Sequence, residues 1–282
     1  MWEFIVKNET AAIITLLSFV IMLILHFVNK KRGKQAEKVY TERYDKLLEE
    51  IKKVQPQYAS KELKEEIHNV VEKIAKPTTA EDWFIKAWSA QVDENYDKAI
   101  VYYERIIEYK PNFIDVVYNN LGNVLIGKKD FDKAIDYFNK GINTTSDALT
   151  LNAINYNMGL AYRRNGEYSK AIECYKKVIE IEPTNVELYI IIANLFDTND
   201  DLDNALQYYH KAAQIEPKDA RIYYEVSVAC MKHAEKLFKN AVSHTDLLLA
   251  DNWRNTAIKH LQRAAQLGDA KSQELLSKLD EV

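Results

Sequence analysis

Imidazole and thiol side chains are the groups in this chain best suited to bind a metal ion. Four of the histidines are scattered over expected helices: His210, His233, His244 and His260. Only Cys230 and His233 stand three residues apart, the spacing that puts two ligands on one helix face. Because a structural zinc site needs four such ligands, this pair alone predicts no metal site.

Adjacent carboxylates could instead support acid–base chemistry. Asp200 and Asp201 are such a pair, but they fall in an expected turn between two helices, where solvated acids and helix caps are common. The sequence has no phosphate-binding glycine loop, no G-x-S-x-G and no H-E-x-x-H. We therefore expect no enzyme activity and no cofactor.

Composition predicts a mostly helical protein. The 282 residues include only 7 glycines and 5 prolines, which leaves few turns. A net charge of −4, with no basic patch beyond residues 30–34, argues against nucleic-acid binding. The two cysteines, Cys174 and Cys230, have no paired spacing, so we expect packed thiols in a reducing compartment rather than a disulfide.

The first 29 residues read as a membrane anchor. Residues 11–28 carry no acidic or basic side chain if His26 is neutral, and as a helix they would span roughly 27 Å of the ~30 Å hydrocarbon layer. Four basic residues among Lys30–Lys34, against one lysine before the run, predict an outer N-terminus and a cytoplasmic remainder at the cell membrane. A cleaved signal peptide is the alternative, but it fits these flanks poorly.

Residues 30–78 follow as a basic segment and a helical stalk. One apolar seam is formed by Tyr40, Tyr44, Leu47, Ile51 and Val54, and a second by Leu63, Ile67, Val70 and Ile74. Pro56 should end the first helix, and Ser60 is a suitable N-cap for the second. We expect a hairpin packed on the domain that follows, while dimerisation through the stalk stays open.

An internal repeat begins near residue 80. Each unit has an alanine followed four residues later by an aromatic side chain, and successive alanines are 35, 37 and 34 residues apart. These alanines are Ala99, Ala134, Ala171 and Ala205, and the small residues twelve positions before them are Ala87, Gly122, Gly159 and Ala193. Each unit is therefore expected to be a pair of closely packed helices.

This pattern resembles the tetratricopeptide repeat over about Ala80 to Leu267. The family's first aromatic position is matched by Trp83, Tyr118, Tyr189 and Tyr223, with Asn155 and Tyr156 in the third unit. The family's terminal proline is matched by Pro111, Pro183 and Pro217, whereas Ser146 stands in the second unit. The resemblance implies an all-α, right-handed solenoid of about five helix pairs over residues 80–282.

The expected repeats cover residues 80–113, 115–148, 152–185, 186–219 and 220–267. The fifth repeat is expected to carry an insertion of roughly eighteen residues, within 232–255, because its second helix is expected to start only near Ala257. This insertion includes Leu247, Leu248, Leu249 and Trp253, and it is expected to extend the first helix and fold back. A last helix over 270–280 would cap the stack with a polar outer face.

The family's concave groove is the expected site of partner binding. By resemblance, the residues that line it are Phe84, Trp88, Asn119, Asn123, Tyr156, Leu160, Arg163, Ile190, Asn194 and Tyr224. Asparagine amides can both donate to and accept from an extended peptide, and aromatic side chains can anchor it. The alternative is that the asparagines solvate a helix face and the aromatics pack inside the stack.

Two functions fit these features. In the first, a membrane-tethered adaptor binds a segment of a partner protein in its groove. In the second, the chain is a structural subunit that self-assembles through the stalk or the repeats, so a homo-oligomer is possible. A third class, an enzyme, has no positive support in the sequence. The family's chaperone-tail clamp is matched only in part, at Asn120, so we do not expect a chaperone receptor.

Overall fold

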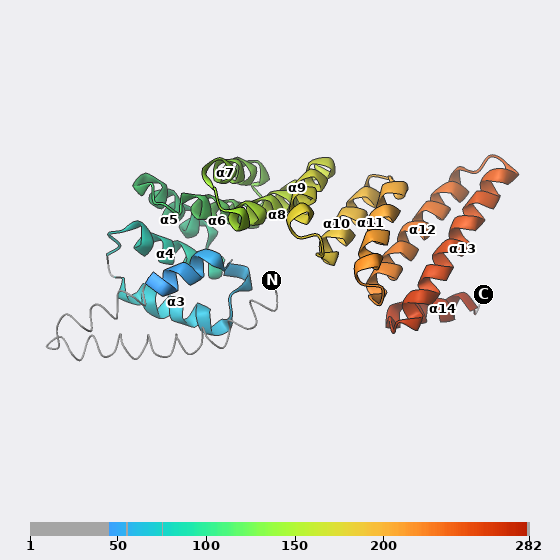
Figure 1. Ribbon diagram of the computed structural model, residues 1–282, viewed down its shortest axis with the longest axis horizontal. Helices are drawn as coiled ribbons and strands as arrows, with labels where there is room; N and C mark the ends of the chain where they lie inside the picture. The colour runs from blue at the N-terminus through green and yellow to red at the C-terminus, as the bar shows by residue number, and fades with distance from the viewer. Residues whose placement is uncertain (1–44, 55, 75, 281–282) are drawn as a thin grey trace. The chain divides into compact units, whose positions relative to one another are not determined.

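The computed structural model describes residues 45–54, 56–74 and 76–280, and this part of the chain is built from helices and turns (Figure 1). After a helix over 45–53, the elements are η1 (Pro56–Tyr58), α3 (Lys61–Lys73), α4 (Ala80–Val92), α5 (Tyr96–Tyr109), α6 (Ile114–Gly127), α7 (Phe131–Thr144), α8 (Ala148–Arg164), α9 (Tyr168–Ile181), α10 (Val186–Thr198), α11 (Leu202–Ile215), α12 (Ala220–Asn240), α13 (His244–Gln266) and α14 (Ala270–Asp280). The predicted all-α helical-repeat architecture is confirmed.

The helices associate as antiparallel neighbours in chain order. α4 packs on α5, α6 on α7, α10 on α11, and α12 on α13. The chain divides into two compact units, one ending at Asn157 and the other beginning at Met158, so that the division falls within α8. The predicted bounds of the domains stay a prediction.

The predicted transmembrane element of the fold is corrected. Within residues 45–280, no helix is long and apolar enough to cross a bilayer. The membrane-spanning helix is therefore removed from the predicted fold class. The prediction of a single-pass protein of the cell membrane, with a cytoplasmic repeat domain, is wrong by this finding. The segment on which that prediction rested, residues 11–28, lies outside the described residues.

The turn between the two helices of a repeat requires a left-handed backbone. In the first four repeats this conformation falls on Glu94, Lys129, Gly166 and Asp200, with φ between 55° and 79°. Only the third repeat uses glycine, which adopts this conformation without steric cost. The next residue in each turn is the N-cap of the second helix, and the side chains of Asn95 and Asp201 accept the backbone N–H of Lys98 and Asn204 there.

Replacing Lys129 by glycine should therefore stabilise the protein by roughly 0.5–1 kcal/mol, because strain at φ 63° is relieved. Lys129→Ala removes the same side chain but keeps the strain, so it should bring no gain. Urea denaturation followed by circular dichroism measures both. A Lys129→Gly variant less stable than wild type would contradict the account of the turn.

Small residues let the two helices of a repeat approach closely. A Cβ atom added at Gly122 would lie 2.4 Å from the ring of Phe138, and one at Gly159 would lie 2.8 Å from the ring of Tyr175. Both rings are buried. The first and fourth repeats have alanine at this position, Ala87 and Ala193, also with no exposed surface.

Gly122→Ala should destabilise the protein by about 1–3 kcal/mol, because the ring of Phe138 must move. The sign is informative, since glycine to alanine within a helix ordinarily stabilises by up to about 1 kcal/mol. Thermal denaturation provides the measurement. Adding Phe138→Leu should recover part of the loss, and a double variant as unstable as the sum of both singles would refute this contact.

Aromatic side chains pair across the two helices in every repeat except the third. Trp83 packs on Tyr102, Tyr118 on Tyr137 and Tyr189 on Tyr208, with ring centroids 5.5–6.2 Å apart. In the fifth repeat Tyr223 stacks on His260 at 6.3 Å. The third repeat has Asn155 and Cys174 at the corresponding positions, so it lacks this pair.

Tyrosine hydroxyl groups connect consecutive repeats. Tyr189 donates to the backbone carbonyl of Pro183, and Tyr223 donates to that of Pro217, both at 3.2 Å. Each bond therefore joins the first helix of one repeat to the proline that ends the preceding one. This gives the repeated proline and aromatic positions a shared structural role.

The segment before the repeats forms a hairpin, as expected. Ser60 caps α3 by accepting the backbone N–H of Leu63. The predicted seams are largely buried, at Leu47, Ile51, Leu63, Ile67 and Val70. α3 and η1 both contact α4, so the hairpin over 45–74 packs on the first repeat.

The insertion in the fifth repeat lengthens both helices of the pair (Figure 1). α12 has 21 residues and α13 has 23, whereas α10 and α11 have 13 and 14. Trp253 packs against the buried cluster of the fourth and fifth repeats and lies edge-on to His233 at 5.2 Å. The three leucines 247–249 stay exposed, and α14 packs on α13.

Candidate partner-binding surface

The ten residues predicted to line the groove differ widely in exposure. Four are buried: Phe84, Trp88, Asn119 and Ile190. Six are partly exposed: Asn123, Tyr156, Leu160, Arg163, Asn194 and Tyr224. Five of the ten belong to the first compact unit and five to the second.

Phe84 and Trp88 do not line an open surface, because both side chains are 0% exposed. Phe84 contacts the rings of Tyr103 and Phe113, with centroids 6.0 and 5.4 Å away. The indole Nε1–H of Trp88 donates to the backbone carbonyl of Val54 at 3.3 Å. The prediction of these two residues as exposed anchors is corrected: both are core residues, and Trp88 is covered by the hairpin over 45–74.

A cluster of side-chain amides occupies the first unit. It comprises Asn119, Asn120 and Asn123 on α6, with Asn157 on α8. Asn157 donates through Nδ2 to the Oδ1 atom of Asn119 at 2.9 Å, which joins the second repeat to the third. Both side chains are buried, so each amide depends on the other for a hydrogen bond.

The same cluster reaches the first repeat through Tyr103. The hydroxyl group of Tyr103 donates to Oε1 of Gln91 at 2.9 Å and also interacts with the amide of Asn120. Burial raises the pKa of Tyr103 well above its usual value, so the hydroxyl keeps its proton. Amides from three successive repeats thus meet on one side of the unit.

Asn123 is the residue of this cluster whose side-chain amide is not fully hydrogen-bonded. Its Nδ2 group is buried and has no acceptor among the described residues. The residue as a whole is partly exposed, and it stands one turn beyond Asn119 and Asn120 on α6. An unpaired amide donor costs free energy unless a partner supplies a carbonyl oxygen, so this group is suited to receive a peptide backbone.

Asn157→Ala should cost about 1–3 kcal/mol of stability, because it leaves the buried oxygen of Asn119 without a donor. Asn139→Ala is the matched control, since Asn139 is exposed on α7 and should change stability by less than about 0.5 kcal/mol. Chemical denaturation of the two variants side by side decides the matter. Equal losses would mean that the amide bond does not contribute.

In the second unit the predicted amide has a partner. Asn194 on α10 accepts a hydrogen bond from the hydroxyl group of Tyr209 on α11. Burial raises the pKa of Tyr209 well above its usual value, so this hydroxyl also remains a donor. Asn194 therefore has its amide nitrogen left for an external acceptor, while its oxygen is engaged.

Tyr224 on α12 has a neighbour that sequence reasoning missed. The ammonium group of Lys271 on α14 lies 4.8 Å from the centre of the Tyr224 ring, and a hydrogen bond to Tyr224 raises the pKa of Lys271. Val228, one turn further along α12, is 43% exposed. An apolar, an aromatic and a cationic side chain are thus available here. The spacing of Tyr224 and Val228, four residues apart on one helix face, is the sequence signal that could have indicated this surface.

The residues first considered for chemistry have structural roles. Cys230 lies in a hydrophobic cluster, and burial raises the pKa of its thiol to about 11. No three potential metal-binding side chains gather within the described residues. Asp201 caps α11, and Asp200 forms an ion pair with Lys236 at 3.0 Å, which lowers the pKa of Asp200.

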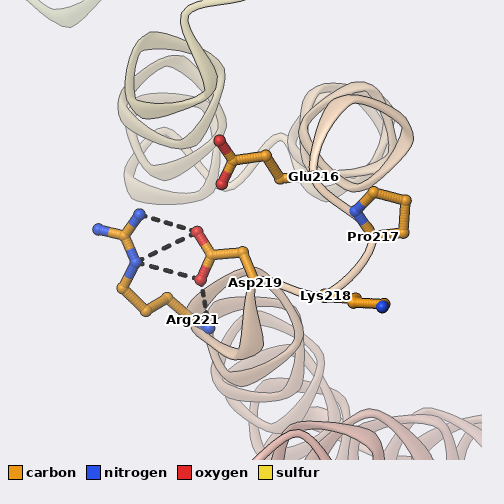
Figure 2. Close-up of a pocket in the computed structure, with 5 residues that line it drawn as sticks. All are labelled: Glu216, Pro217, Lys218, Asp219 and Arg221. Atoms are coloured by element: carbon orange, nitrogen blue, oxygen red, sulfur yellow. Dashed lines mark hydrogen bonds and ion pairs between the residues drawn. The ribbon is translucent and has the colours of Figure 1, made fainter. Parts of the chain in front are cut away.

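A hollow of about 590 Å³ lies at the turn between α11 and α12 (Figure 2). Its wall includes Asp219, which accepts hydrogen bonds from the backbone and guanidinium groups of Arg221. Burial opposes the charge on Asp219, but these bonds outweigh it and lower the pKa of Asp219. Arg221 also reaches Glu187 at 3.3 Å. These groups satisfy one another, so the hollow is a capped turn rather than a ligand site.

Comparison with known families defines the class of the repeats. Profiles described as tetratricopeptide repeat match residues 83–113, 116–147, 154–185 and 186–219. A profile described as Sel1 repeat matches residues 252–269, in α13 and the turn after it. Four tetratricopeptide repeats therefore lie in series over residues 83–219, in agreement with the predicted resemblance.

Individual relatives are distant. MamA 41-end from Desulfovibrio magneticus RS-1 has 14% identity and a TM-score of 0.54, covering 70% of this chain and 100% of that one. YrrB, whose crystal structure is titled a TPR protein with an unusual peptide-binding site, has 16% identity and a TM-score of 0.53, covering 75% and 97%. These similarities show the fold alone.

One curated relative matches in sequence. BBSome complex member BBS4 of Bos taurus is 29% identical over 89 residues, which are 32% of this chain. The match spans only 17% of the length of BBS4. The match carries no inference about the whole of that protein.

Proposed function

We propose that this chain is a protein-interaction scaffold whose tetratricopeptide repeats bind a peptide segment of another protein. The proposal rests on four such repeats in series and on similar folds that include a TPR protein described as having a peptide-binding site. The expected chemistry is recognition of an extended backbone rather than catalysis. Within each unit, packed helix pairs provide a surface that such recognition can use.

The unpaired amide donor of Asn123 carries the finer part of the proposal. A peptide carbonyl that accepts from Nδ2 of Asn123 would satisfy a buried group that has no acceptor in the described part of the protein. Tyr156, on the first unit's part of α8, is partly exposed and offers an aromatic contact. Backbone hydrogen bonding of this kind gives affinity, while the aromatic neighbour selects apolar side chains.

In the second unit, a peptide would meet a different set of groups. Leu160, Arg163, Asn194 and Tyr224 are the predicted residues that are partly exposed there. Lys271 adds a positive charge beside Tyr224. We infer that this unit favours a segment with apolar and acidic side chains, because a cation and an aromatic ring lie together.

The test uses a random peptide library displayed against the full chain, followed by titration of the selected peptides. Asn123→Ala should weaken their binding about 5- to 10-fold, the effect of one lost hydrogen bond of about 1 kcal/mol. Asn139→Ala makes the same chemical change on α7 of the same repeat and should leave the affinity unchanged. If every selected peptide binds Asn123→Ala as tightly as wild type, this surface is not the site.

A further inference from the structure

The hairpin over 45–74 covers a position that the other repeats leave open. In the second to fifth repeats, the residues equivalent to Trp88 are Asn123, Leu160, Asn194 and Val228, and all of them keep some exposure. Trp88 is 0% exposed although its side chain is the largest. Its indole group donates to Val54, and η1 lies against α4, so the end of the helix over 45–53 and the following turn form the cover.

α3 holds a carboxyl group in an unusual environment inside this hairpin. Glu66 is only 3% exposed, and its Oε2 atom has no hydrogen-bond partner among the described residues. Its charged neighbour is Glu50, on the facing helix over 45–53. Burial, reinforced by the like charge of Glu50, raises the pKa of Glu66 to about 7, and burial also raises the pKa of Glu50.

His68, two residues further along α3, joins the hairpin to α4. Its Nε2 atom lies 2.9 and 3.0 Å from the two carboxylate oxygens of Asp93, which follows α4. Its Nδ1 atom lies 2.8 Å from the backbone carbonyl of Lys64. Both ring nitrogens therefore face acceptors, an arrangement that only the doubly protonated, positively charged ring satisfies.

The pKa of His68 is raised. The carbonyl of Lys64, the carboxylate of Asp93 and the charge of Glu72 together outweigh the opposing effect of burial. Both titrating groups of α3 thus favour the packed hairpin when they are protonated. Loss of the proton from Glu66 leaves a buried charge facing Glu50. Loss of the proton from His68 removes the ion pair with Asp93.

We propose that the hairpin over 45–74 is a proton-controlled cover on the first-repeat end of the partner-binding face, closed while Glu66 and His68 hold their protons and released as they lose them. Release exposes Trp88, the aromatic side chain that the hairpin keeps from solvent. This role as a regulator of partner binding rests on the proposed function, whereas the opening itself is a property of the chain alone.

The direction follows from linkage. A carboxyl group whose pKa is raised from 4.5 in the open state to about 7 in the closed state stabilises closure at low pH, and this contribution disappears as pH rises through about 7. Between pH 6 and pH 8, Glu66 alone should raise the opening equilibrium constant about tenfold. His68, whose pKa is also raised, changes the equilibrium in the same direction.

Hydrogen–deuterium exchange of the full chain, corrected for intrinsic rates, measures this opening at pH 6, 7 and 8 without any partner. In wild type, protection of the amides of α3 should fall about tenfold or more between pH 6 and pH 8, while α10 amides serve as an internal reference. Glu66→Gln keeps the shape and removes the charge, so it should reduce that fall about tenfold, and it should be about 30-fold better protected than wild type already at pH 6, where the open state of wild type has lost this proton.

Glu65→Gln is the matched control, because Glu65 is exposed on the same helix and should behave as wild type. Protection of α3 that does not change with pH, or that changes equally in Glu66→Gln and wild type, would overturn the proposal. Peptide binding is measured separately through Asn123→Ala, so a failed peptide selection would count against the partner-binding function and leave the exchange result as it stands.

Discussion

The close approach of two helices at a small residue is the constraint on which the repeats depend. At Gly122 and Gly159 the facing aromatic ring already occupies the space of a Cβ atom. The pairing recurs along the chain at a constant separation: Ala87 with Tyr103, Gly122 with Phe138, Gly159 with Tyr175, and Ala193 with Tyr209. Once two helices are fixed at this distance, their remaining apolar faces can be buried only by the next pair, so stacking follows from the contact.

Polar groups are placed by the same geometry. The hydroxyl groups of Tyr103 and Tyr209 are carried by the rings that fill the interface, and each reaches an amide, Gln91 or Asn194, on the first helix of its repeat. Their burial requires these hydrogen bonds. The amide cluster of the first unit is therefore partly structural, and Asn123 differs from its neighbours in having a donor that this network does not use.

Much of the fold could be predicted, because the spacing of alanine, glycine and aromatic residues indicates where two helices are in contact. The N-cap at Ser60 and the lengthened fifth repeat were also readable, since both rest on local sequence. The candidate partner-binding surface was harder to predict from the sequence. Phe84 and Trp88 were assigned by position within a repeat, and position cannot reveal that both are buried, with Trp88 beneath the preceding hairpin. The left-handed turn residues Glu94, Lys129 and Asp200 were missed because none of them is glycine. The membrane-spanning element rested on the apolar run over residues 11–28 and its flanking charges, and it is corrected because no helix of the described residues is long and apolar enough to cross a bilayer.

The third repeat differs from the others in a way that bears on how the protein comes apart. It has Asn155 and Cys174 where other repeats have an aromatic pair, and the buried Oδ1 atom of Asn155 has no donor among the described residues. In a repeat protein, each helix pair is stabilised mainly by contacts with its neighbours, so the pair with the fewest stabilising contacts unfolds first. On heating, the third repeat should therefore unfold first, while the repeats before and after it keep their structure, so that unfolding does not start at the terminal helices.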